Sequence, residues 1–262
     1  MNTGIQDANN LIWKLELALR DERKYDALLD TYNTERQPVG KRVGLSSLHN
    51  MRSHAAIMDV ALGLSPGKSI EENQAKIAPA FDETHPDYAA KRDAIGRAQK
   101  VLGCEFKAPG AVVGWFYPSA GVNNGGGEFH TGQLRADGTL NPEFYVPSTI
   151  PGHFVPHAWS HKGNKRKPVF DLVGMSQLLL LARGSGWEEL GDDRVRYEHV
   201  GDGGWDDVDE MWARQCGVSE DGSVLVRPDG IVAWRGQRGG MTSKSWERLI
   251  DKLLHFPVDT NS

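Results

Sequence analysis

The sequence predicts an α/β protein in two parts: a mostly helical part over residues 1–150 and a part of alternating strands and helices over 151–262. Apolar residues recur every three or four positions near the start of the chain, which is typical of helices. Towards the end, short apolar runs alternate with amphipathic stretches. Between them "YVPSTIPGHFVPHAW" (145–159) contains three prolines and indicates an extended connector, so we place the boundary there.

The opening "MNTGIQDANNLIWKLELALR" (1–20) predicts a helix. Thr3 and Gln6 have the spacing of a capping box, in which each side chain bonds an amide at the helix start. One apolar stripe follows, made of Ala8, Leu11, Ile12, Leu15, Ala18 and Leu19. Because unpaired amides and the helix dipole attract anions, the amides around Asn2 and Thr3 could hold a negative ligand atom. Equally, any capped helix start has these features.

A second helix is predicted from about residue 26 into the fifties, and Pro38 is expected to end or kink it. The stretch at 40–64 then forms either one kinked helix with it or a further helix. A polar region over about 65–90 precedes a short helix in "YAAKRDAIGRAQKVLG" (88–103). The Gly-, Asn- and aromatic-rich stretch at 110–140 favours short strands and turns.

The C-terminal part alternates strands and helices. "SQLLLLARG" (176–184) predicts a buried strand, "RVRYEHVG" (194–201) a second strand, and "WDDVDEMWARQCG" (205–217) a helix. "VLVRPDGIVAWRG" (224–236) indicates a hairpin, since proline and glycine favour a turn between two β-rich runs. "TSKSWERLIDKLLHF" (242–256) predicts a terminal amphipathic helix capped by its first threonine or serine.

Composition bounds the class of protein. With 262 residues, 39% hydrophobic and 25% charged, the chain is expected to fold into a packed core. A net charge of −5 argues against binding nucleic acid. The longest apolar run, Leu178 to Ala182, is too short to span a membrane, and the N-terminus lacks signal-peptide features, so we expect a cytoplasmic protein. Cys104 and Cys216 form no CxxC, and no disulfide is expected.

Several common catalytic and binding motifs are absent. "ARGSGWEEL" (182–190) has Glu189 where a dinucleotide-binding motif needs its third glycine. The spacing of His153, His157 and His161 would suit metal ligands on a helix, but the intervening prolines favour a connector, so no metal is expected. No G-x-S-x-G is present, and the residues alone identify no catalytic group.

Four segments carry a family resemblance. "MNTGIQDANNLIWKL" (1–15) and "LLDTYNTERQPV" (28–39) resemble the second half of the FAD domain in class A flavoprotein aromatic hydroxylases, the group of phenol hydroxylase and pentachlorophenol monooxygenase. Residues 127–159 resemble that family's connector, and 224–236 resemble the close of its thioredoxin-like C-terminal domain. The resemblance covers essentially the whole chain. It implies that 1–150 is a partial FAD and substrate domain and 151–262 a thioredoxin-like domain.

The resemblance also implies a cofactor and a site. FAD would be the cofactor, NAD(P)H the co-substrate and an aromatic small molecule the ligand. Met1, Asn2 and Thr3 fall at the amide turn that faces the flavin pyrimidine, and Gln6 and Asp7 belong to the same motif. The chain departs from the family pattern because it lacks both the G-x-G-x-x-G motif and the Gly-Asp motif. Where a redox thioredoxin has two cysteines, it has "RGSGW" (183–187), so a packing or dimerisation role is expected.

The leading hypothesis is therefore the C-terminal portion of an FAD- and NAD(P)H-dependent aromatic monooxygenase that does not bind FAD tightly alone. A second hypothesis is a flavin-independent binding protein, isomerase or cyclase for a polyketide-like aromatic ligand, with Trp115, Phe116 and Tyr117 lining its pocket. Those three residues equally suit an ordinary core. A third is a subunit that completes a separate FAD-binding chain or forms a homodimer, and a fourth is a sequence that lacks its upstream part.

Overall fold

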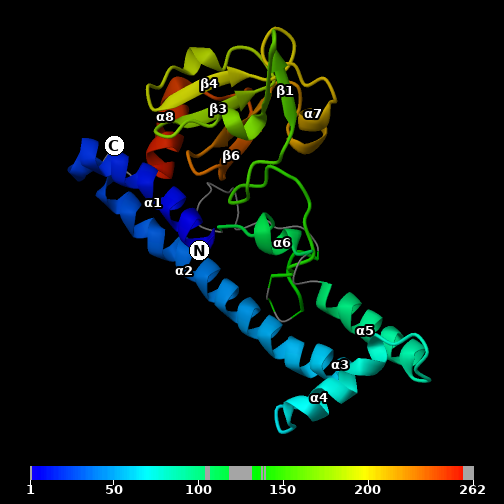
Figure 1. Cartoon of the computed structure of the whole chain (residues 1–262). Coiled ribbons are helices and arrows are strands. Elements are labelled where there is room, and N and C mark those ends of the chain that lie inside the picture. The colour runs from blue at the N-terminus through cyan, green and yellow to red at the C-terminus, as the bar shows by residue number, and fades with distance from the viewer. Residues whose placement is uncertain (1, 104–106, 118–131, 137, 139, 256–262) are drawn as a thin grey trace.

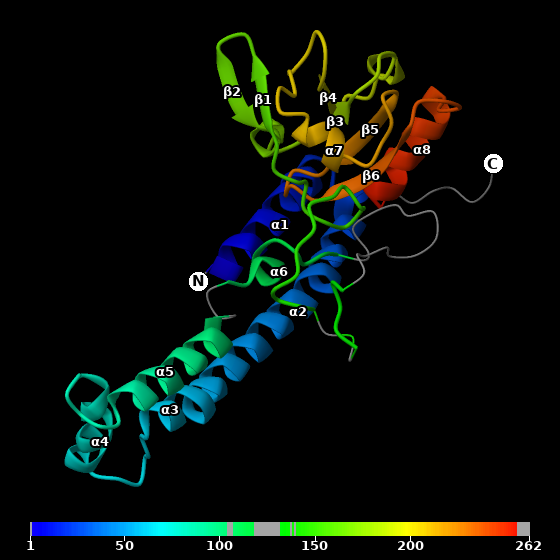
Figure 2. The ribbon, with the colours of Figure 1, turned by 90° about the vertical axis from the view of Figure 1, so that its right-hand side faces the viewer.

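The computed structural model describes residues 2–103, 107–117, 132–136, 138 and 140–255. Two long helices, α1 (Asn2–Arg20) and α2 (Glu22–Ser53), form an antiparallel pair and are joined at Asp21. A small sheet packs against the end of this pair where the two helices join, and a helical arm extends from the other end of α2 (Figures 1 and 2). The first helix is thus present where the sequence predicts it.

Pro38 does not end α2, so of the two predicted alternatives the structure has one continuous helix and not two. The helix passes through Pro38 and continues into a π-helical turn, η1 (His54–Asp59), and α3 (Val60–Leu62), which ends at Gly63 with φ 75°. A mid-helix proline removes one hydrogen bond and costs about 3 kcal/mol. The side chains beside it are buried: Glu35 and Arg36 before it and Val39 after it. Tertiary contacts of this kind outweigh local preference.

The arm consists of short helices that fold back on the end of α2. They are α4 (Ile70–Ile77), η2 (Ala78–Ala80) and α5 (Tyr88–Leu102). A capping box between Ser69 and Glu72 starts α4. The predicted helix at 88–103 is confirmed as α5, and a single turn, α6 (Pro109–Val112), follows it. Among the described residues, none of the helices combines the length and the apolarity that crossing a membrane requires.

The C-terminal part contains two sheets. A hairpin of β1 (Trp159–Lys162) and β2 (Lys165–Pro168) projects from the connector, as Figure 2 shows. The main sheet has the strand order β4-β3-β5-β6. Its strands are β3 (Leu178–Ala182), β4 (Val195–His199), β5 (Gly222–Val226) and β6 (Val232–Gln237). β3 and β4 are parallel, whereas β5 runs antiparallel to both β3 and β6. The two strands and the hairpin predicted for the C-terminal part are confirmed. The short strands predicted over 110–140 are present among the described residues only as isolated bridges at Phe116, Leu134 and Leu140.

Short helices lie between these strands and after the last of them. They are η4 (Val169–Leu172) before β3, η5 (Glu188–Leu190) between β3 and β4, α7 (Met211–Gln215) between β4 and β5, and α8 (Ser243–Leu253) after β6. The helix predicted over 205–217 is shorter than expected, because Trp205 and Asp206 pair instead with Val200 and His161 in isolated bridges. Thr242 caps α8, its hydroxyl accepting a hydrogen bond from the amide of Ser245.

The hydrophobic core joins the first helices to the sheet. β3 is buried on both faces, so its side chains divide between two clusters. One cluster combines Leu178, Leu180 and the tryptophans Trp187, Trp234 and Trp246 with residues of α1 and α2, namely Trp13, Leu17, Ala18, Tyr25 and Leu28. The helix pair is therefore held against the C-terminal sheet by apolar packing at one of its ends.

Candidate functional site

The start of α1 differs from the predicted capping box. α1 already includes Asn2 and Thr3, so Thr3 is not the residue before the helix. Gln6 does not close a capping box either, since its side-chain oxygen lies 3.5 Å from Nη2 of Arg36. Met1 falls outside the described residues. The amides of the first turn are nevertheless unpaired within the helix, as at every helix start.

One side of this first turn is open. Gly4 has no side chain, and a Cβ built there would meet no described atom within 4 Å. The next side chain, Ile5, is exposed. A flat ligand could therefore approach bare backbone at the positive end of the helix dipole.

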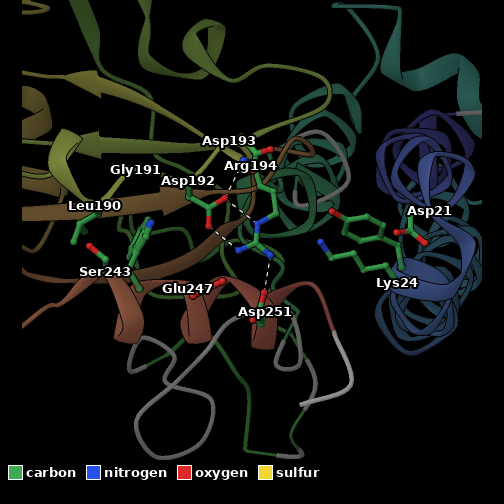
Figure 3. A pocket seen from close by; sticks show the side chains of 12 residues that line it. Asp21, Lys24, Leu190, Gly191, Asp192, Asp193, Arg194, Ser243, Glu247 and Asp251 are labelled. Carbon is green, nitrogen blue, oxygen red and sulfur yellow. Dashed lines mark hydrogen bonds and ion pairs between the residues drawn. The ribbon is translucent and has the colours of Figure 1, made fainter. Parts of the chain in front are cut away.

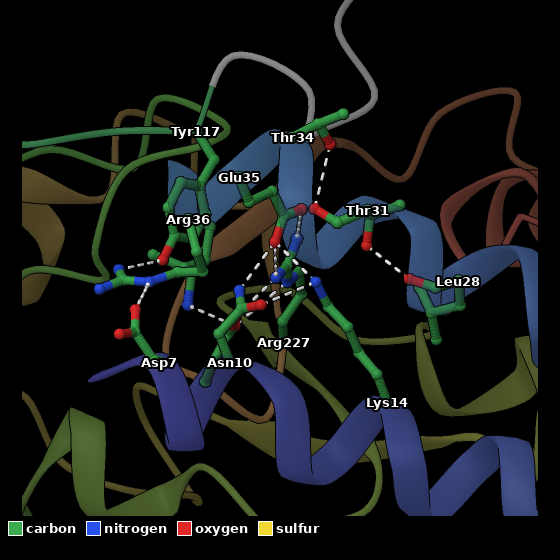
Figure 4. Close-up of polar contacts among 12 residues, drawn as sticks. Asp7, Asn10, Lys14, Leu28, Thr31, Thr34, Glu35, Arg36, Tyr117 and Arg227 are labelled. Atoms are coloured by element: carbon green, nitrogen blue, oxygen red, sulfur yellow. Dashed lines mark hydrogen bonds and ion pairs between the residues drawn. The ribbon is translucent and has the colours of Figure 1, made fainter. Parts of the chain in front are cut away.

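Arg36 of α2 holds the other side of the helix start. Its Nε donates to Asp7 Oδ1 at 2.6 Å, and Nη1 donates to the hydroxyl of Tyr117 at 2.7 Å (Figure 4). Nη2 lies 3.4 Å from the backbone oxygen of Thr3, and the guanidinium carbon lies over the ring of Trp115, 5.4 Å from its centroid. Burial raises the pKa of Tyr117, which keeps its hydroxyl neutral as an acceptor for arginine. One guanidinium thus joins α1, α2 and the segment at 115–117.

A second cluster of charges lies one turn further along. Glu35 accepts two hydrogen bonds from Arg227, at 2.7 and 2.9 Å, and one from Lys14 at 2.8 Å. Asp229 accepts from Arg227 at 2.6 Å and from Asn10 at 3.1 Å. All five side chains are buried, with two cations facing two carboxylates. Figure 4 shows the labelled members converging between the helix pair and the turn that carries Arg227.

Burial and the neighbouring charges shift the pKa values of Glu35 and Lys14. Burial opposes ionisation of Glu35, but the adjacent Arg227 and Lys14 lower its pKa to about 2. Burial and the neighbouring Arg227 lower the pKa of Lys14 to about 8, against the attraction of Glu35. The lowered pKa of Glu35 keeps it ionised, whereas burial makes the charged form of Lys14 less favourable than in water.

These residues come from the segments that resemble the hydroxylase family. Asn10 and Lys14 lie in the first segment, Glu35 in the second, and Arg227 and Asp229 in the hairpin turn. The network itself is not predicted from these segments. One local feature could have indicated a polar contact inside the fold: Asn10 and Lys14 are four residues apart on one helix face. Both bond Glu35, which lies 25 and 21 residues away, and Asn10 also bonds Asp229, which lies 219 residues away. No local pattern predicts such pairing.

The aromatic residues proposed as a pocket lining belong to the core. Trp115, Phe116 and Tyr117 are 3%, 7% and 2% exposed. Trp115 packs edge-on against Phe154, with ring centroids 4.5 Å apart. Neither of the two larger cavities is lined by these side chains. The ordinary-core interpretation is therefore the one that the structure supports.

A cavity of about 880 Å³ lies at the opposite end of α1. It is formed by Asp21 after α1, the first turn of α2, the loop at 190–194 and α8 (Figure 3). The guanidinium of Arg194, which lines this cavity, is already ion-paired with Asp192 and Asp251, each at 2.6 Å. The far end of α1 is about 27 Å from the open first turn, so the two features are separate.

No cluster of metal ligands occurs among the described residues. His153 lies near Gln133 in the connector, His157 follows it there, and His161 lies in β1, so the three histidines do not share a helix. Cys216 is buried and free, and Cys104 falls outside the described residues.

The fold and the site match two family models. "FAD binding domain" matches residues 1–46, which cover α1 and most of α2. "Aromatic-ring hydroxylase, C-terminal" matches residues 148–255, which contain both sheets. Together the two matches indicate a family of flavin-dependent aromatic-ring hydroxylases. The chain belongs to the FAD-dependent aromatic-ring hydroxylases, as the resemblance implies, and FAD is the cofactor of that family.

Individual relatives agree with this assignment. Phenol 2-monooxygenase of Pseudomonas sp. (strain EST1001) is 33% identical over 96% of this chain and 42% of the relative. 2,4-Dichlorophenol 6-monooxygenase of Delftia acidovorans is 32% identical over 90% of this chain and 41% of the relative. The crystal structure of the flavin-dependent monooxygenase PieE, in complex with FAD and substrate, matches with a TM-score of 0.80 and 32% identity, covering 98% of this chain and 44% of PieE. The chain thus spans about two fifths of these relatives.

Proposed function

We propose that this chain supplies the flavin-facing helix and the C-terminal unit of a monooxygenase that uses FAD and NAD(P)H to hydroxylate an aromatic small molecule. The observation that carries the proposal is the first turn of α1. It presents bare backbone at Gly4 and lies within the FAD-binding match. On its other side Arg36 holds it through a hydrogen bond to Asp7. The names of the relatives, which include phenol and dichlorophenol monooxygenases, support the substrate class.

The residues at this turn suit the role. The amides of Asn2 and Thr3 lie at the positive end of a 19-residue helix, where a negatively charged flavin edge would be stabilised by about 0.3–1 kcal/mol. FAD, when bound, supplies the electrons and the oxygen activation for hydroxylation. The chain's own contribution is to hold the amides in place, and Arg36 does so through Thr3 and Asp7.

We further propose that the 262 residues alone do not hold FAD tightly. A helix-terminus contact supplies about 2 kcal/mol at most, whereas a micromolar dissociation constant needs about 8 kcal/mol. The sequence contains no G-x-G-x-x-G, the motif that receives the pyrophosphate. The purified chain should therefore be colourless. A visible flavin absorbance band that survives gel filtration would overturn this proposal.

The C-terminal unit is proposed to be thioredoxin-like and to act by packing. The parallel pair β3–β4, the antiparallel hairpin β5–β6 and the terminal α8 support the thioredoxin-like arrangement. After β3, the site of redox cysteines is occupied by "RGSGW" (183–187), and the indole of Trp187 is buried and donates to the backbone oxygen of Asp221. Because this segment has no cysteine and its tryptophan is buried, its proposed role is to pack into the core and not to carry out thiol chemistry.

The division into 1–150 and 151–262 remains a proposal, as does the association with a second copy or an FAD-binding chain. The shared core and the network around Glu35 support two parts that act as one body. The cytoplasmic location expected from the sequence also stays a prediction.

A further inference from the structure

A second cavity, of about 220 Å³, adjoins the cavity of about 880 Å³ beside α8. The residues that line both are Asp21, Lys24, Tyr25, Asp193 and Arg194, and Figure 3 labels four of them at the larger cavity. The two cavities differ in their other walls. The larger one is lined mostly by polar residues, whereas the smaller one reaches the hydrophobic core. The smaller cavity is therefore an apolar recess beside a polar one.

The inner wall of this recess comes from the core that α1 shares with the sheet. It is formed by Trp13, Leu17, Leu178 and Leu254, all of which are buried. An engineered apolar cavity of about 150 Å³ binds benzene, and pockets for drug-sized ligands begin at about 300 Å³. At about 220 Å³, the recess suits one aromatic ring with a small substituent.

The indole of Trp13 brings an unused hydrogen-bond donor to this wall. Its Nε1 is buried and has no hydrogen-bond partner among the described residues. A buried indole N–H normally has an acceptor, because leaving it unpaired is unfavourable. Two cations lie over the ring: the guanidinium carbon of Arg227 is 5.1 Å from the centroid, and Nζ of Lys14 is 5.8 Å from it. The donor is thus fixed in place beside the recess.

The surroundings of the recess restrict the chemistry of the acceptor. A carboxylate held against this apolar wall would lose its hydration in exchange for one neutral donor, which is unfavourable. The guanidinium of Arg194 is already ion-paired with Asp192 and Asp251. A hydroxyl oxygen accepts from an indole without carrying charge, and its proton can be donated to Ser176 or Asp193, which line the same cavity. The donor and acceptors together favour an uncharged ring that carries a hydroxyl.

We propose that this recess binds a single-ring phenol, whose oxygen accepts a hydrogen bond from Nε1 of Trp13 and whose ring packs against Leu17 and Leu178. The site is separate from the proposed flavin-facing turn, because Trp13 lies about 15 Å along α1 from Thr3. It goes beyond the proposed function, since its walls belong to the described chain and it needs no flavin. A test without FAD therefore leaves the proposed function untouched.

Titration of the isotope-labelled 262-residue chain with phenol tests the site. The indole N–H resonance of Trp13, assigned in the wild type from its contacts with neighbouring protons, should shift downfield and saturate. The expected dissociation constant is on the order of 1 mM, which is within the reach of so small a ligand. Benzene has the same ring without the oxygen and should bind about fivefold more weakly, because it leaves the N–H unpaired. Benzoate should also bind more weakly than phenol, because it is charged.

Two tryptophan variants separate the hydrogen bond from general effects. Trp13→Phe keeps an aromatic ring without the donor, and it should bind phenol no more tightly than benzene. Trp212→Phe is the matched control: Nε1 of Trp212 is also buried without a partner among the described residues, but Trp212 lines neither cavity. Its affinity for phenol should equal that of the wild type. If Trp13→Phe does not fold, the comparison of phenol with benzene in the wild type still decides the result.

Three outcomes overturn the inference. The first is that the wild type shows no binding of phenol up to about 20 mM, well above the expected dissociation constant. The second is that phenol and benzene bind equally, or that phenol binds without moving the indole resonance of Trp13. The third is that benzoate binds more tightly than phenol, which would make the recess a site for anions.

Discussion

Glu35 and Arg227 lie 192 residues apart in the sequence and are joined side by side by two buried hydrogen bonds of 2.7 and 2.9 Å. Glu35 belongs to α2, and Arg227 to the turn between β5 and β6. The pair therefore links the helices of the FAD-binding match to the sheet of the hydroxylase C-terminal match. Through Asn10 and Lys14 the same carboxylate also holds α1. This contact fixes the proposed flavin-facing helix to the C-terminal unit.

Removing the charge of Glu35 should destabilise the whole chain. In Glu35→Gln the buried Arg227 and Lys14 lose their shared carboxylate, and breaking such a pair costs about 3–5 kcal/mol. Urea unfolding measures the loss. The matched control is Glu72→Gln, which removes the charge from an exposed pair with Lys68 and should change stability by about 0.5 kcal/mol or less. Equal effects from the two variants would show that the buried network does not hold the parts together.

Acid should remove the same contribution. The pKa of Glu35 is lowered from 4.5 to about 2, so its stabilisation is complete above the unfolded value and is lost as pH falls from about 4.5 towards 2. A shift of this size corresponds to about 3 kcal/mol. The gap in unfolding free energy between wild type and Glu35→Gln should therefore narrow between pH 6 and pH 3. A gap that stays constant over this range would contradict the depressed pKa.

Lys14 predicts a second rise of stability with pH, in the alkaline range. Its pKa is lowered from 10.5 to about 8, so between these values the unfolded chain binds more protons than the folded chain. Stability from this group should rise with pH across that window, by about 3 kcal/mol at most. Comparing wild type with Lys14→Met isolates the effect, because methionine keeps the length without the charge. If the difference between the two proteins does not change from pH 7.5 to pH 10, Lys14 is not desolvated.

Arg36 should be needed for order at the start of α1 and not replaceable by lysine. Its planar guanidinium reaches Asp7, Tyr117 and the backbone of Thr3 together, which a single ammonium cannot do. In Arg36→Lys, hydrogen exchange of the amides at 6–9, which are bonded within α1, should quicken by about tenfold while exchange within the sheet stays slow. Arg52→Lys, at an exposed position of α2, is the control. Unchanged protection at 6–9 in Arg36→Lys would remove arginine from the positioning role.

Local patterns predicted most of the secondary structure. α5, the strands β3 and β4, the hairpin around "RPDG" and the capped α8 all depend on residue spacing and turn chemistry within a short window. The fully buried β3 was recognisable because a strand covered on both faces has no polar alternation.

Long-range contacts explain what the sequence analysis missed. Thr3 and Gln6 have capping-box spacing, yet Gln6 faces Arg36, which lies 30 residues away. Pro38 stays within α2 because its neighbours are buried. The apolar stripe of α1 predicted one buried face, whereas the sheet selected the face with Trp13 and Lys14. In each case a distant partner outweighed a local preference.

The central claim is that the first turn of α1 faces the flavin, and titration of the isotope-labelled chain with FAD, followed by the backbone amide resonances, tests it most directly. We expect shifts confined to the amides of residues 2–6 that do not saturate at millimolar FAD, because about 2 kcal/mol corresponds to a dissociation constant of about 30 mM. Arg36→Lys should reduce those shifts. Shifts centred instead on the cavity at 190–194 and α8, or no shift at the highest FAD concentration, would contradict the account.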